Sequence, residues 1–230
     1  MSATPLHANQ IELLKFVPEP LRTEIARRMH PKKAQKGQTI LQEGTHSFDV
    51  FFLLEGQAEV LLYEPDDGDT VFVNVIGAGD LVGEIAALDR TFRSASVVAY
   101  SDVRYAIMTA SDFNACIESS PAAATWLARR LASSVRRLTD KVFELSALTV
   151  PMRICRELFR LSEKGSMRNG FIEVADLPTH GILASRASTH REAVTRELGV
   201  LKKEKIVDYE DDGRVLKILN LPRLQREARL

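Results

Sequence analysis

Hydrophobic and polar positions follow three successive patterns along the 230 residues of the chain. Scattered apolar residues and two prolines predict a broken helix over 11–30. From 38 to 108, short runs rich in β-branched and aromatic residues alternate with glycine turns, which is typical of an antiparallel roll or barrel. From 121 onward the apolar positions return at helical spacing, so an α+β chain long enough for two domains is predicted. The clearest strand runs lie at 50–54, 58–63 and 71–76.

One long helix is predicted from Pro121 to about Ala147, because Ser119 or Ser120 can cap it and proline is favourable in a first helical turn. Its apolar residues recur every seven positions, and this spacing favours a parallel coiled coil with a second copy of the chain. The same side of the helix could instead face the roll. The leucines predicted to form the dimer contact are Leu127, Leu131, Leu138 and Leu145.

A second, smaller domain is predicted after this helix. Thr149 followed by Pro151 is typical of a new helix start, so residues 145–149 are the predicted hinge. The stretch 177–206 has the pattern of a helix, a turn and a second helix, capped by Thr179 and Thr189 respectively. Alternating apolar positions beyond it predict a β-hairpin wing. The strands of this hairpin are expected at 206–209 and 214–218, joined by 210–213, with a third strand at 171–174.

The second of these helices carries side chains suited to reading DNA. Arginine can bind guanine through O6 and N7, and glutamate can accept a hydrogen bond from the amino group of cytosine. Arg191, Glu192 and Arg196 lie near the start of the helix, where a recognition helix meets base edges. A solvated helix face with internal ion pairs is the alternative. Residues expected to complete the interface, at phosphates, are His180, Thr189 and His190.

A short segment before the long helix carries the parts of a phosphate site. Gly83 lets the backbone approach an anion closely, and N–H groups that follow it would point at the anion if they open a helical turn. Arg93 supplies a planar fork of donors that matches phosphate oxygens. Glu84, as an acceptor, suits a sugar hydroxyl, although an isolated pair of this kind is more often a surface ion pair. The candidate ligand-binding residues are Gly83, Glu84, Ile85, Ala86, Arg93 and Ser94.

Composition limits the classes of function. The 31 basic residues balance the 31 acidic ones, so only the local basic patch between His180 and Lys205 favours nucleic acid. An acidic run at 64–69 predicts an exposed hairpin turn. No apolar run is long enough for a bilayer and the first ten residues lack a secretory signal, so a cytoplasmic location is expected. The two cysteines, Cys116 and Cys155, are expected to be free thiols.

Enzyme chemistry is not expected. The sequence contains no Ser/His/Asp set, paired-carboxylate cleft or His/Cys cluster with metal-ligand spacing, so no catalytic residue and no metal ligand is predicted. No cysteine precedes Cys116, which argues against an N-terminal iron–sulfur cluster.

The run from Gly79 to Ser96 closely resembles the phosphate-binding cassette of cyclic-nucleotide-binding domains. The arginine–glutamate–arginine arrangement on the second helix, together with the wing, resembles the cAMP receptor protein (Crp/Fnr-type) family of bacterial transcription regulators. This resemblance implies a cyclic-nucleotide-binding β-roll at 1–120, a dimerisation helix and hinge at 121–148, and a winged helix-turn-helix DNA-binding domain at 149–230. The implied ligand is cAMP, acting as an allosteric effector that shifts a population of conformations.

The same resemblance implies the partners. A homodimer is expected to bind double-stranded DNA at a two-fold symmetric operator, with half-sites one helical turn, about 34 Å, apart. RNA polymerase is a further implied partner, and no membrane is involved. An alternative is a cyclic-nucleotide-gated module that regulates a partner protein, but such a module does not need a base-reading helix.

The chain departs from the family pattern at two places. Ser188 occupies the turn position that is usually glycine, which predicts a strained turn. Alignment through Asp140 puts Leu138 and Thr139 at the two positions that contact adenine in the family, and only the second retains a hydroxyl. Leu138 and Thr139 are therefore added to the ligand-site candidates, and the choice between cAMP, cGMP and another ligand stays open.

Overall fold

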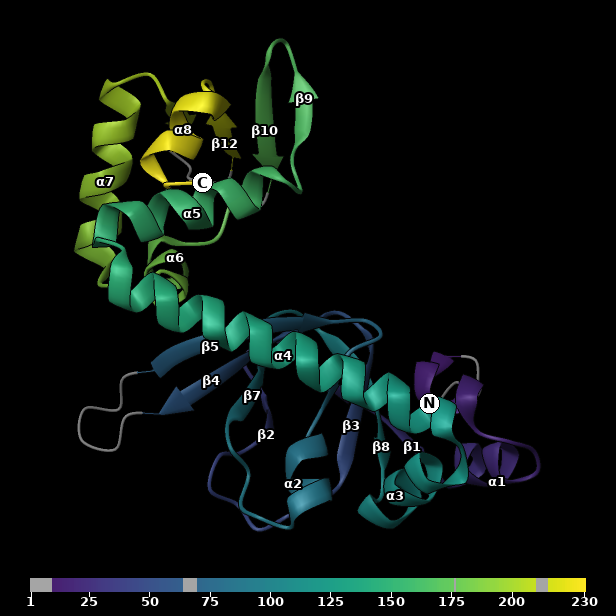
Figure 1. The fold of residues 1–230 in the computed structure, drawn as a ribbon. Helices are drawn as coiled ribbons and strands as arrows, with labels where there is room; N and C mark the ends of the chain where they lie inside the picture. The colour runs from purple at the N-terminus through teal and green to yellow at the C-terminus, as the bar shows by residue number, and fades with distance from the viewer. Residues whose placement is uncertain (1–9, 64–69, 176, 210–214) are drawn as a thin grey trace. The chain divides into compact units, whose positions relative to one another are not determined.

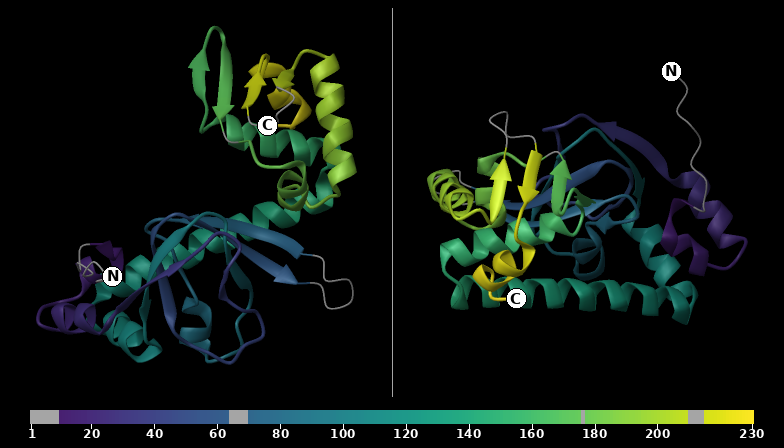
Figure 2. Two further views of the ribbon diagram at one scale, coloured as in Figure 1. Left: turned by 180° about the vertical axis from the view of Figure 1, so that it is seen from behind. Right: turned by 90° about the horizontal axis from the view of Figure 1, so that it is seen from above.

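The computed structural model describes residues 10–63, 70–175, 177–209 and 215–230 (Figure 1). Internal contacts divide the chain into two compact units, Met1–Arg137 and Leu138–Leu230. The division falls inside one continuous helix, α4 (Pro121–Ala147), whose course can be followed in both views of Figure 2. The helix predicted as a segment of its own is thus shared between the two units.

The first unit contains a roll of two antiparallel sheets, as the alternation of strand runs and glycine turns predicts. Within the described residues each sheet has four strands. One sheet has the order β1 (His30–Ala34), β8 (Val103–Met108), β3 (Val50–Glu55), β6 (Leu81–Val82). The other has the order β2 (Thr39–Leu41), β7 (Ser96–Ala99), β4 (Gln57–Tyr63), β5 (Thr70–Gly77).

Helices pack against this roll and complete its core. The region 11–30 forms a short 3₁₀ helix, Glu12–Phe16, and α1 (Leu21–Arg28), separated where the two prolines stand. In the chain, α2 (Glu84–Asp89) follows β6 and precedes β7, and α3 (Ala110–Ser119) lies between β8 and α4. The Ser120 hydroxyl accepts a hydrogen bond from the backbone of Ala123 at 3.1 Å, which confirms it as the cap of α4. Apolar residues of the first α4 turns, including Trp126 and Leu127, are buried in the core.

The second unit is a small α+β domain with one apolar core. Its helices are α5 (Val150–Ser162), α6 (His180–Arg186), α7 (Arg191–Lys203) and α8 (Leu221–Glu227). Its sheet has the order β11 (Val207–Tyr209), β12 (Val215–Ile218), β10 (Phe171–Ala175), β9 (Ser166–Arg168). The antiparallel pairing of β11 with β12 confirms the predicted hairpin, and the helix–turn–helix is α6 and α7. The segments 64–69 and 210–214, predicted as turns, lie outside the described residues.

One predicted cap is wrong. The N-cap of α7 is His190, not Thr189, and its side chain makes no capping hydrogen bond. The backbone N–H of Thr189 donates instead to the carbonyl of Ala184 at 2.9 Å, because the chain is still closing the preceding helix there. Ser188 just before it has a φ of +49°, so the predicted strain at the glycine-less turn is present.

Candidate functional site

The cassette begins where β6 turns into α2. Gly83 precedes α2 with a φ of +89°. A Cβ atom at this position would lie 2.5 Å from Nη1 of Arg93 and 2.8 Å from the carbonyl oxygen of Asp49. Backbone conformation and close packing therefore both require glycine here.

Arg93 is buried behind this glycine, with 3% of its surface exposed. Its Nε donates to the Ser47 hydroxyl at 3.0 Å, Nη1 to the Gly83 carbonyl at 3.0 Å and Nη2 to the Asp49 carbonyl at 2.6 Å. A guanidinium has five N–H donors, so these contacts use three of them and leave two for an anion. The neighbouring Ser94 is exposed.

A pocket of about 330 Å³ lies beside the cassette, within the first unit. Its lining residues come from β5, from β6 and the start of α2, and from α4. This volume lies at the lower end of the range for small-molecule sites, which suits a ligand the size of a mononucleotide. The lining residues are Asn74, Val75, Ile76, Asp80, Leu81, Glu84, Leu127, Arg130, Leu131, Ser133, Ser134 and Arg137.

Glu84 is the carboxylate of this pocket. Burial raises its pKa above the ordinary value of 4.5. A hydrogen bond from the backbone N–H of Glu84 itself and the positive charges of Arg130, Arg93 and Arg137 oppose that rise only in part. None of these arginines comes within ion-pair distance of Glu84 in the part of the chain that the structure describes. The carboxylate is therefore surrounded by positive charge without a direct ion pair among the described residues, which favours contact with a ligand.

The α4 wall contains polar side chains that were not among the predicted site residues. Arg137 donates to the hydroxyl of Ser133 at 3.2 Å and to that of Ser134 at 2.8 Å. Arg130 pairs with Asp80, Nη2 to Oδ1 2.6 Å, and its guanidinium lies 5.3 Å from the centre of the Trp126 ring. Their spacing of three, four and seven residues on one helix was the available sequence signal.

Leu138 and Thr139, predicted to contact the base, are not among the residues that line the pocket. They belong to the second unit, and Leu138 is 51% exposed. Of the remaining cassette residues, both on α2, Ala86 is buried and Ile85 is 45% exposed.

The predicted dimer leucines fall into two groups. Leu127 is buried in the core of its own unit, and Leu131 packs against that core. The heptad spacing predicted a dimer contact for both leucines and gave no indication of these contacts within the chain. Leu138 and Leu145 are exposed and continue along α4 as an apolar face. The other exposed apolar residues of this face are Val135, Val142 and Phe143.

The candidate nucleic-acid interface lies on α7. Val194, Leu198 and Leu201 bury one side of this helix in the second core, which turns Arg191, Glu192 and Arg196 to the exposed side. His180 contributes from α6, where its Nδ1 lies 2.9 Å from the hydroxyl of Thr195. Burial and the charge of Arg191 lower the pKa of His180 below its ordinary 6.5. Thr195 was not predicted as part of this surface.

Comparison with known proteins agrees with this geometry. Residues 31–120 match the family model of the cyclic nucleotide-binding domain, and residues 152–227 match that of the Crp-like helix-turn-helix domain. The two domains together define a class of protein, the DNA-binding transcription regulators that carry a cyclic nucleotide-binding domain. No helix in the described part of the chain is long and apolar enough to cross a membrane.

The relatives that the chain matches identify its family within this class. The cyclic AMP receptor protein of Thermus thermophilus is 30% identical over 181 residues, 79% of either chain. A CRP-like cAMP-activated global transcriptional regulator from Mycobacterium tuberculosis is 24% identical over 206 residues, which are 89% of this chain and 91% of that protein. The fold also matches the solved structure of a CooA mutant from Carboxydothermus hydrogenoformans, with a TM-score of 0.75 at 18% identity over 88% of either chain. The chain belongs to the Crp/Fnr family of transcription regulators.

Proposed function

We propose that this protein is a cAMP-responsive, sequence-specific regulator of transcription that acts in the cytoplasm as a homodimer. The observation that carries the proposal is Glu84, a carboxylate that burial destabilises, which lines a pocket of mononucleotide size and directly follows Gly83, whose carbonyl accepts a hydrogen bond from the buried Arg93. The names of the Thermus and Mycobacterium relatives, a cyclic AMP receptor protein and a cAMP-activated regulator, support cAMP as the ligand.

The residues present fit a cyclic nucleotide. Its phosphate would meet the two remaining N–H groups of Arg93 beside Gly83, and a ribose hydroxyl would donate to Glu84. The base would then extend toward α4, where Ser133, Ser134 and Arg137 offer hydroxyl and guanidinium groups. A hydrogen bond from a ribose hydroxyl would offset the desolvation of the Glu84 carboxylate.

One feature favours cGMP as a second candidate ligand. A guanidinium fork matches the O6 and N7 acceptors of guanine, whereas adenine presents an amino donor where guanine has O6. Arg137 on the pocket wall is such a fork. Cyclic GMP therefore competes with cAMP as the natural effector, and only the α4 wall distinguishes the two.

Calorimetric titration with cAMP and cGMP side by side tests the ligand. We expect micromolar-range binding of at least one nucleotide, and Arg137→Gln should change the ratio of the two affinities. Arg136→Gln, an exposed neighbour on the same helix, is the matched control and should leave the ratio unchanged. Absence of binding by either nucleotide contradicts the assignment of the pocket.

The recognition surface is tested by selecting binding sites from random DNA with nucleotide present. The wild type should select a two-fold symmetric sequence, because a homodimer presents two copies of α7. Arg196→Ala should weaken binding by roughly 1–3 kcal/mol and relax one position in each half-site. Arg226→Ala, exposed on α8, is the control. If Arg196→Ala selects the same consensus with equal stringency, Arg196 does not read bases; if the wild type selects nothing, a module that regulates a protein partner becomes the better proposal.

The dimer is tested on the exposed apolar face of α4. Leu138→Asp would bury an unpaired charge at a coiled-coil position and should give monomers in sedimentation. Leu219→Asp changes another exposed apolar residue, outside α4, and should leave the dimer intact. A stable Leu138→Asp dimer would show that the copies associate through another surface. RNA polymerase, as the partner of the DNA-bound dimer, completes the proposal.

A further inference from the structure

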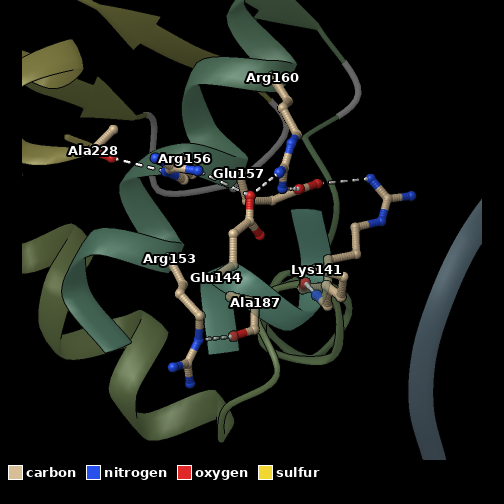
Figure 3. Close-up of polar contacts among 9 residues, drawn as sticks. Lys141, Glu144, Arg153, Arg156, Glu157, Arg160, Ala187 and Ala228 are labelled. Carbon is tan, nitrogen blue, oxygen red and sulfur yellow. Dashed lines mark hydrogen bonds and ion pairs between the residues drawn. The ribbon is translucent and has the colours of Figure 1, made fainter. Parts of the chain in front are cut away.

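A polar network centred on one buried carboxylate surrounds the junction of α4 and α5 in the second unit (Figure 3). Lys141 and Glu144 come from the last turns of α4, and Arg153, Arg156 and Arg160 come from α5. The pattern of leucines on α4 gave no indication of it, because these charged residues lie between the heptad positions.

Glu144 is the centre of this network and is 3% exposed. Its Oε1 accepts a hydrogen bond from Arg160 Nη2, and Arg156 Nη1 lies 3.4 Å from the same oxygen. Arg156 continues the network to the end of the chain, where it donates to the carbonyls of Ala228 at 2.9 Å and Arg229 at 3.1 Å. A buried carboxylate is tolerated only when its partners are held in place, so these contacts fix α4 to α5 and to the end of α8.

A second set of contacts connects the same junction to the turn between α6 and α7. Arg153 donates from Nε to the Ala187 carbonyl and from Nη2 to the Ser188 carbonyl, both at 2.9 Å, and from Nη1 to the Leu148 carbonyl at 3.0 Å. Lys141 on α4 donates to the Arg186 carbonyl at 2.6 Å. Two cations thus satisfy the carbonyls at the end of α6, where the macrodipole favours positive charge.

The turn held in this way is the strained one. Ser188 has a positive φ that a serine adopts only at a cost, so the surrounding contacts must determine it. Its position decides where α7 begins. Lys141 and Arg153 contact this turn directly. Glu144 acts on it indirectly, because it holds α5, which carries Arg153, against the last turns of α4.

We propose that Glu144, Lys141 and Arg153 are positioning residues for DNA binding: they hold the start of α7 in a defined orientation to the end of the dimerisation helix. The proposal rests on the proposed function, in which α7 reads the operator. Residues 145–149, predicted as the hinge, then form a braced junction that transmits the orientation of α4 to α7. In a dimer this bracing sets the separation of the two recognition helices.

Amide hydrogen exchange tests the coupling without DNA. Glu144→Gln removes the charge but keeps the shape, and we expect exchange at residues 187–189 to become about tenfold faster. Lys141→Met should give an increase in the same amides. Glu163→Gln, an exposed glutamate just after α5, should leave them unchanged. Unchanged exchange at 187–189 in Glu144→Gln overturns the proposal, whatever the protein binds.

The preference for one half-site separation in the operator is a property that a general loss of stability would not change. With nucleotide present, the wild type should prefer one half-site separation and lose affinity when the spacer changes by about two base pairs. Glu144→Gln should bind its best operator about tenfold more weakly and discriminate less between spacers, while its nucleotide titration stays that of the wild type. Wild-type spacing preference in Glu144→Gln contradicts a positioning role. If the wild type binds no symmetric DNA, the proposed function fails, and the exchange measurement still decides the coupling.

Discussion

Glu84 in the first unit and Glu144 in the second are both withdrawn from water, yet their surroundings differ. Glu144 is 3% exposed and has Arg156 and Arg160 as direct partners. Glu84 has three arginines near enough to affect its pKa, but none forms an ion pair with it in the described part of the chain. Desolvation is thus compensated by direct ion pairs at Glu144 and only partly compensated at Glu84.

This difference separates a scaffold from a binding site. A carboxylate whose ionic partners are already in place gains little from a ligand, and its removal disturbs the structure. A carboxylate that burial destabilises without an ion pair gains when a donor from a ligand arrives. Four predictions follow from treating the first unit as the site of binding and the second as a braced frame.

The largest effect is expected at Arg93. Arg93→Ala removes the donors of the phosphate site and should weaken cyclic-nucleotide binding by about 2–5 kcal/mol, to below detection in calorimetry. Arg93→Lys retains the charge but not the fork and should lose much of the affinity. Arg90→Ala, an exposed arginine after α2, is the control and should bind normally. Near-native affinity of Arg93→Ala for the nucleotide would show that the cassette does not bind the phosphate.

The next effect concerns the frame. Glu144→Ala leaves the partly buried Arg156 and the exposed Arg160 without their carboxylate and should destabilise the second unit by up to about 3 kcal/mol. Trp126, the single tryptophan, belongs to the first unit, so its fluorescence should report an unchanged transition while circular dichroism reports an earlier one. Glu163→Ala is the control. If the tryptophan transition shifts equally, the network stabilises the whole chain rather than one unit.

A smaller effect of opposite sign is expected at Glu84. Because its folded pKa is raised, the folded protein holds this proton more tightly than the unfolded chain does. The stability associated with the proton is present below the ordinary pKa of 4.5 and is lost as pH rises through the raised folded value. Glu84→Gln should therefore make the unliganded first unit more stable than the wild type at neutral pH, although it binds nucleotide less tightly.

Urea unfolding followed by Trp126 fluorescence between about pH 4.5 and pH 8 measures this difference. The stability gain of Glu84→Gln should grow with pH across this range. Glu118→Gln, an exposed glutamate of α3 in the same unit, should change neither stability nor its pH dependence. A Glu84→Gln protein less stable than the wild type at pH 8 would mean that Glu84 has a stabilising partner and that the comparison with Glu144 does not hold.

The smallest effect is one in which the two units should behave alike. Each contains one buried free cysteine, Cys116 or Cys155, and burial raises the pKa of either thiol to about 12. Neither should react with a chromogenic disulfide reagent at about pH 8 until the protein is unfolded. Rapid reaction of one thiol in the native protein would identify the unit that opens locally, and a matching change on adding nucleotide would link that opening to the ligand.

Much of the fold was predicted from local pattern. The strand runs, the glycine turns, the cap at Ser120 and the hairpin after α7 depend on residues close together in sequence, so their chemistry is readable there. The strain at Ser188 was predicted for the same reason. Thr189 was misassigned as a cap because two adjacent residues can begin the same helix, and the closing contact to Ala184 decides between them.

The candidate sites were predicted unevenly. Gly83, Glu84 and Arg93 lie within eleven residues, and their pattern indicated a phosphate site directly. Arg137 and its serines were missed because their relation to Glu84 exists only once α4 packs beside the roll. Heptad spacing grouped Leu127 with Leu138, although the first is buried within the chain and the second is exposed.

The sequence by itself determined which segments become helices and strands, the residue types of the cassette, and the polar side of α7. These follow from short-range spacing, hydrogen bonding and backbone preference. Only the tertiary structure decided which face of α4 is buried, which side chains surround Glu84, and that Glu144 meets α5 while Lys141 meets the turn before α7. Those contacts join residues far apart in the sequence, 50 positions in the case of Arg130 and Asp80, and depend on how whole elements pack, which no local pattern encodes.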